Sequence, residues 1–215
     1  MTENLLEAQY DITKKSKLRI FYDKYKFFLY FLLIILILFF SYFSLYLENK
    51  KNKRVLLSDD YLQAKVFLDN GEKINATNLL KEIALANDST YSTLSFFLLI
   101  NQNLIVDKKD ISNLFDHIIS KNKFSDEDKN LLIYKKTLFS STYLSESELL
   151  DEVKLLLNSN TSWKAHGHLL LGDYFTSKNE NLKAIEFYQQ VFNIKNLNQD
   201  LYSYARFQLS LISNE

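Results

Sequence analysis

The sequence predicts an all-α protein with one N-terminal transmembrane helix, about four helical hairpins and a C-terminal helix. An uninterrupted apolar segment lies near the N-terminus, and beyond it apolar residues recur at three- and four-residue spacing. The chain has no proline and only three glycines. Its turns must therefore use Asn, Asp, Ser and Lys, which favours short helix–helix connections over β-hairpins.

The apolar segment comprises residues 27–47, which carry no charge. A helix of that length extends for about 31 Å, close to the roughly 30 Å of a bilayer's hydrocarbon core. A helix of this length in a soluble protein would normally carry a polar stripe, and a cleavable signal peptide would have a shorter apolar centre. We therefore expect a retained transmembrane helix. A polar tail (residues 1–26) precedes it, and a charged juxtamembrane linker (48–57) and a repeat domain (58–215) follow it.

The net charge of zero hides an asymmetry. Residues 1–58 contain ten Lys or Arg and five Asp or Glu, whereas residues 59–215 contain sixteen and twenty-one. The basic end can contact anionic membrane lipid. The acidic remainder has a single arginine and lacks the basic stripe that nucleic acid requires, so no nucleic-acid partner is expected. The apolar segment has six basic residues on one flank and five on the other, so the positive-inside rule barely favours a cytoplasmic N-terminus.

Breaks in the helical pattern are rich in turn-forming residues. They fall around residue 71 and at 87–90, 106–110, 123–128, 145–148, 158–162 and 177–181. Ser145 and Glu148 have the spacing of a capping box, in which side chain and backbone satisfy each other at a helix start. A last helix is expected near 198–213.

One stretch near the C-terminus matches the tetratricopeptide pattern. That pattern has Leu-Gly, an aromatic residue three positions after the glycine, an alanine twelve after it and another aromatic four beyond. Leu171, Gly172, Phe175, Ala184 and Tyr188 occupy those places. A small residue on each helix lets the two backbones of a hairpin pack closely, and large side chains fill the space to the next hairpin.

The same pattern recurs in weaker form towards the N-terminus, where Ala64, Phe67, Ala76 and Leu80 match it. The position equivalent to Ala184 falls at 76, 111, 149 and 184. These intervals lie near the expected period of about 34 residues. The hairpins are therefore predicted to form a tetratricopeptide-like α-solenoid, with an irregular helical bundle as the alternative.

The sequence offers no candidate catalytic, cofactor-binding or metal-binding residues. His166 and His168 lie two apart and point about 200° away from each other on a helix, so one packed and one exposed histidine is expected. The acidic run 126–128 lacks the spacing of a calcium loop and suits a helix N-terminus, as does Asp59-Asp60. Three scattered glycines cannot form a phosphate loop, and no small-molecule substrate is expected.

With these parts in this order, the chain resembles the YfgM-type ancillary subunit of the bacterial Sec translocon. The resemblance is most specific in two stretches, NDSTYSTLSFFLLINQNLI (87–105) and WKAHGHLLLGDYFTSKNENLKAIEFYQQVF (163–192). In the second stretch, His168 and Leu169 replace the more usual Ala-Asp of the family. The family has no catalytic residues. The resemblance implies a single-pass protein of the bacterial inner membrane with a cytoplasmic N-terminus and a periplasmic C-terminal domain. It also implies contacts with Sec translocon subunits and with periplasmic chaperones that handle exported proteins.

We therefore expect a non-enzymatic, membrane-anchored protein-interaction module that binds a partner segment in a concave groove. Helical phase assigns His166, Asp173, Thr176 and Ser177 to the groove side of the strongest repeat. A scaffold in cell-envelope assembly or cell division is the alternative. An enzyme whose site is assembled from distant residues is a third possibility.

Overall fold

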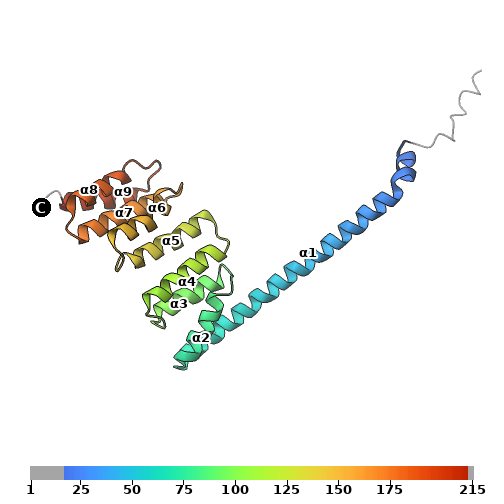
Figure 1. Ribbon diagram of the computed structural model, residues 1–215, viewed down its shortest axis with the longest axis horizontal. Helices are drawn as coiled ribbons and strands as arrows, with labels where there is room; N and C mark the ends of the chain where they lie inside the picture. Colours follow the sequence, from blue (N-terminus) through green and yellow to red (C-terminus); the bar gives the residue numbers. More distant parts are fainter. Residues whose placement is uncertain (1–16, 213–215) are drawn as a thin grey trace, which may run out of the picture. The chain divides into compact units, whose positions relative to one another are not determined.

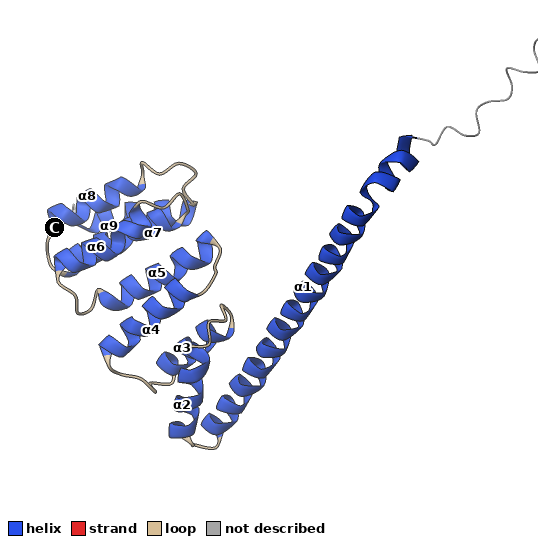
Figure 2. Cartoon of the chain, turned by 45° about the vertical axis from the view of Figure 1, so that its right-hand side comes forward, coloured by secondary structure: helices blue, strands red, loops and turns tan. Residues whose placement is uncertain are grey.

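The computed structural model describes residues 17–212, and every regular element among them is a helix (Figures 1 and 2). The helices are α1 (Lys17–Asp69), α2 (Lys73–Ala84), α3 (Tyr91–Asn101), α4 (Lys108–Lys121), α5 (Asp126–Ser140), α6 (Glu146–Leu157), α7 (Trp163–Ser177), α8 (Asn181–Val191) and α9 (Gln199–Ile212). The chain divides into two compact units, Met1–Leu56 and Leu57–Glu215, which are described separately. We call the second unit the body.

Helix α1 contains the predicted span. Among the described residues it is the one helix long and apolar enough to cross a membrane, and none of its most apolar window is buried. The juxtamembrane segment 48–57 is helical rather than irregular, and helix also covers residues 17–26 of the expected tail. Residues 1–16 of that tail lie outside the described residues. The expectation that Asp59-Asp60 marks a helix start is wrong, because α1 continues through both residues.

Each expected break overlaps a connection between two helices, and several extend into the first turn of the next helix. Three helices begin at a residue whose side chain accepts a hydrogen bond from the third backbone N–H of the helix: Asp107, Ser125 and Ser145. The capping box at Ser145 and Glu148 is complete. The acidic run 126–128 forms the first turn of α5, where carboxylates favour the positive end of the helix dipole.

Asparagine closes most of the turns that glycine would otherwise close. Gly71 has a φ of 79°, and Asn103 and Asn179 take the same left-handed conformation with φ of 52° and 59°. After Asn179, the Glu180 N–H donates to the Phe175 carbonyl at 3.0 Å, a 6→1 bond that ends the helix. The same bond follows Asn103 and Gly71. Asn is the residue other than glycine that adopts this conformation most readily, so the chain forms tight hairpins with few glycines.

From α2 onward, each helix of the body packs against the next in the chain, and α7 also touches α5 and α9 (Figure 2). One core cluster runs through consecutive helices from the C-terminal end of α1 to α5, and a second runs from α6 to α9. Lys136 of α5 forms ion pairs with Asp116 of α4 at 2.8 Å and Glu152 of α6 at 3.2 Å. Of the nine predicted packing residues, eight are buried and Phe67 is half-buried.

The α7–α8 hairpin depends on Gly172. A Cβ atom there would lie 2.4–2.8 Å from three ring atoms of Tyr188, which is fully buried. The group that requires the glycine is therefore the Tyr188 ring, one turn beyond the predicted contact at Ala184. Gly167 has a parallel role that the sequence did not suggest. A Cβ there would lie 3.2 Å from the Leu156 Cβ atom, so α6 approaches α7 closely at this point.

We predict that Gly172→Ala destabilises the body. Overpacking of a core costs about 1–3 kcal/mol, and the better helix propensity of alanine returns about 1 kcal/mol at most, so a net loss of about 1–2 kcal/mol is expected. Chemical unfolding of the full chain in detergent measures the change. In a Tyr188→Leu background, where the ring is gone, Gly172→Ala should be neutral or stabilising. An equal cost in both backgrounds would contradict this account of the glycine.

Candidate functional site

The four candidate partner-binding residues lie on α7, the helix that contacts both α5 and α9. Asp173 and Ser177 are exposed, and His166 and Thr176 are half-buried. Their local settings differ. Asp173 is held by tyrosines from α8 and α9, and His166 packs among aromatic rings near the start of α7.

Asp173 is the centre of a hydrogen-bonded group. The Tyr188 hydroxyl donates to its Oδ1 atom at 2.7 Å, and the Tyr204 hydroxyl lies 3.1 Å from both carboxylate oxygens. The Tyr188 ring lies over Gly172, so its hydroxyl reaches the next residue of α7. Thr176 extends the group, because its hydroxyl donates to the Gly172 carbonyl at 2.9 Å and lies 3.3 Å from the Tyr188 hydroxyl. The group thus links α7, α8 and α9.

Burial sets the protonation of this group. Asp173 as a whole residue remains exposed, but its carboxyl is partly desolvated where the tyrosines cover it, and this desolvation raises its pKa above the ordinary value, while the hydrogen bonds from Tyr188 and Tyr204 lower that pKa in part. Burial also raises the pKa of the Tyr204 and Tyr134 hydroxyls, and the nearby Asp173 carboxylate raises both further. The tyrosines therefore remain protonated at neutral pH, and Tyr188 and Tyr204 donate hydrogen bonds to the acid.

An aromatic group lies on the same side of α7, towards its N-terminus. The His166 ring lies 4.7 Å from the Trp163 ring and 5.4 Å from the Tyr134 ring of α5, and the latter two rings are 5.5 Å apart. Burial lowers the pKa of His166, which favours the neutral imidazole. His166 is therefore part of an aromatic surface rather than a cationic group. His168, two residues on, is buried, as expected for one of the pair, but His166 is half-buried rather than exposed.

A hollow of about 360 Å³ lies on the surface between α5 and α7. Asp173 and Ser177 line it together with Tyr134 and Leu138 of α5, and the Leu138 side chain is half exposed. His166 and Thr176 do not line this hollow. On the other side of Asp173, α9 carries Tyr204, Phe207 and Leu211 at the spacing of a helical stripe, and all three are exposed. We call the surface formed by these side chains the Asp173 face: Tyr134, Leu138, Asp173, Ser177, Tyr204, Phe207 and Leu211.

The parts of the Asp173 face that lie on α5 and α9 were not predicted from the sequence. Tyr134, Leu138, Tyr204 and Phe207 had no assigned role because helical phase was applied to α7 alone. Shifting the groove positions of α7 by the repeat spacing would have pointed to Leu138 and Leu211, but not to Tyr134, Tyr204 or Phe207.

The site residues do not form a metal centre. No group of three or more His, Cys, Asp or Glu side chains in residues 17–212 could hold a metal ion. The arrangement around Asp173 instead offers one carboxylate, several tyrosine hydroxyls and large apolar side chains. Such a surface can bind a polypeptide by apolar contact and hydrogen bonding.

No protein-family model matches the chain, and no curated protein or solved structure shows significant similarity to it. The case for function therefore depends on the residues and their geometry.

We predict a pH-dependent effect of Asp173→Asn. A raised pKa means that the folded state binds the proton of Asp173 more tightly than the unfolded state does. Its contribution to stability is present at low pH and is lost as the pH rises above the ordinary Asp value of about 3.9. The stability of Asp173→Asn relative to the parent should therefore increase as the pH rises from the ordinary Asp pKa through the raised pKa of Asp173 in the folded chain. Thermal unfolding of both chains across the pH range checks this, and the opposite slope would refute the direction of the shift.

Proposed function

We propose that the chain is a membrane-anchored protein-interaction module whose body is a tetratricopeptide-like α-solenoid. The proposed partner surface is the Asp173 face. In such solenoids, alternate helices of successive hairpins line one face, and here α7 contacts both α5 and α9, the alternate helices on either side of it. The fit of the Tyr188 ring over Gly172 in the α7–α8 hairpin and the left-handed residue after α7 also support this repeat architecture.

The observation that carries the proposal is the exposure of large apolar side chains on the Asp173 face. Leu138, Phe207 and Leu211 each expose about half or more of their surface beside the half-exposed Tyr204. Contiguous apolar surface rimmed by polar groups is typical of protein-binding sites. Aromatic residues are also enriched at the energetic centres of interfaces.

The long apolar α1 supports an anchor in a membrane, and we place the chain in the bacterial inner membrane as a single-pass protein. In this proposal the N-terminus is cytoplasmic and the body is periplasmic. The partners are Sec translocon subunits and the periplasmic chaperones that receive exported proteins. Anchoring raises the effective concentration of the Asp173 face at the membrane, so that modest intrinsic affinity is sufficient for capture.

We predict that a photo-crosslinking amino acid at Ser177 captures translocon subunits or periplasmic chaperones in intact cells. Ser177 lines the hollow between α5 and α7, so a bound segment would lie within reach. The matched control is the same amino acid at Leu155, which is exposed on α6, and it should capture none of these partners.

Two results would count against this proposal. Capture of cell-wall or division proteins at Ser177 would favour the scaffold function instead. A C-terminus that proteases reach only from the cytoplasmic side would contradict the proposed topology and, with it, a role beside the translocon.

A further inference from the structure

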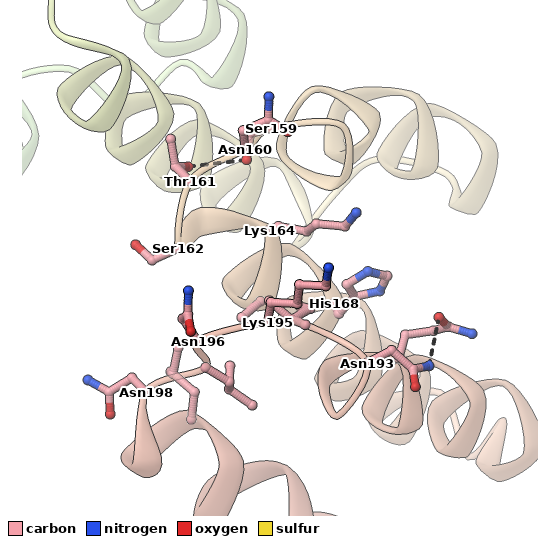
Figure 3. A pocket seen from close by; sticks show the side chains of 15 residues that line it. Ser159, Asn160, Thr161, Ser162, Lys164, His168, Asn193, Lys195, Asn196 and Asn198 are labelled. Carbon is pink, nitrogen blue, oxygen red and sulfur yellow. Dashed lines mark hydrogen bonds between the residues drawn. The ribbon is translucent and has the colours of Figure 1, made fainter.

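A separate hollow of about 540 Å³ lies between the loop that joins α6 to α7 and the loop that joins α8 to α9 (Figure 3). In that view, residues 159–162 lie on one side and residues 193–198 on the other, with Lys164 and His168 of α7 between them. We call it the loop hollow. None of its lining residues belongs to the Asp173 face.

The chemistry of the loop hollow differs from that of the surrounding surface. Fifteen residues line it, and none of them carries a carboxylate, whereas acidic residues outnumber basic ones in residues 59–215. Two of the fifteen are lysines, Lys164 and Lys195. Apart from His168, the remaining polar groups are amides and hydroxyls, most of them on the two loops.

His168 gives a second, independent indication of a ligand. It lines the hollow, only 9% of its surface is exposed, and its Nδ1 atom has no hydrogen-bond partner. Leaving a buried polar atom without a partner costs stability, so native proteins rarely leave one unpaired unless a ligand or water binds there. Burial, with the nearby Lys164, lowers the pKa of His168 and keeps the ring neutral at pH 7. A neutral imidazole can place a donor or an acceptor at Nδ1.

Size and charge narrow the class of ligand. Two lysines with no opposing carboxylate match the charge of about −1.5 to −2 that a phosphate monoester carries at pH 7. Lysine is also a common phosphate-binding residue. A volume of about 540 Å³ exceeds that of a bare phosphate and lies in the range of small-molecule sites. The amides and hydroxyls suit the oxygen atoms of the group that the phosphate esterifies.

We propose that the loop hollow binds a phosphate monoester of small-metabolite size, with Lys164 and Lys195 holding the phosphate and the loop amides holding its substituent. The ester can be a free molecule or the headgroup of phosphatidic acid, the phospholipid whose phosphate is a monoester, since both present the same chemistry. This site is independent of partner binding at the Asp173 face.

Calorimetric titration of the full chain in phosphatidylcholine nanodiscs tests the proposal, with glycerol 3-phosphate and inorganic phosphate as probes at constant ionic strength. We expect saturable binding of glycerol 3-phosphate. The double variant Lys164→Gln/Lys195→Gln should weaken it about tenfold or more, because it removes both charge-assisted contacts. Lys81→Gln/Lys109→Gln, which removes the same charge elsewhere in the body, should leave binding unchanged.

A further variant keeps the proposal testable if the lysine double variant misfolds. Asn196 has a φ of 56°, which glycine adopts freely, so Asn196→Gly removes a lining amide while keeping the turn. It should weaken binding of glycerol 3-phosphate more than binding of inorganic phosphate.

Nanodiscs that contain phosphatidic acid separate the two sources: loss of the soluble ester's binding there assigns the headgroup, and retention assigns the free ester. The proposal is overturned if neither probe binds saturably, or if the control pair weakens binding as much as Lys164→Gln/Lys195→Gln.

Discussion

The contact of the Tyr188 ring with Gly172 determines both the packing of the last hairpin and the form of the proposed partner surface. The ring is fully buried and occupies the space that any Cβ at position 172 would need. Its position on α8 carries its hydroxyl to Asp173, where Tyr204 of α9 adds a second donor. One buried aromatic side chain thus packs two helices together and fixes the acid on the surface between α5 and α9.

The hairpins around this contact are made without the residues that usually make them. Asn103 and Asn179 stand in left-handed positions where glycine is common, and each is followed by the backbone bond that closes a helix end. Such turns define where each helix stops, and Asp107, Ser125 and Ser145 define where three of them start. Local chemistry therefore specifies helix length, which leaves core packing to specify how the helices meet.

These local signals explain why the sequence predicted helix boundaries and buried positions better than it predicted the surface. Turn and cap residues act within a few positions, so the breaks and the capping box at Ser145 could be predicted. The helical continuity of α1 through Asp59-Asp60 could not, because adjacent acids favour a helix start without requiring one. Tyr204 reaches Asp173 across 31 residues of sequence, and the loop hollow joins two separate turns. Such juxtapositions depend on tertiary packing, which periodicity alone does not reveal.

The central claim is that the Asp173 face of a membrane-anchored body binds protein partners. Affinity purification of the full chain from membranes tests it most directly, by comparing the parent with Phe207→Ser/Leu211→Ser. Both side chains are exposed, as are Leu155 and Leu182 on α6 and α8, whose matched double serine variant serves as the control. The account predicts that translocon subunits or periplasmic chaperones copurify with the parent and the control and are lost from the α9 variant. The same partners at the same yield in all three samples would contradict it.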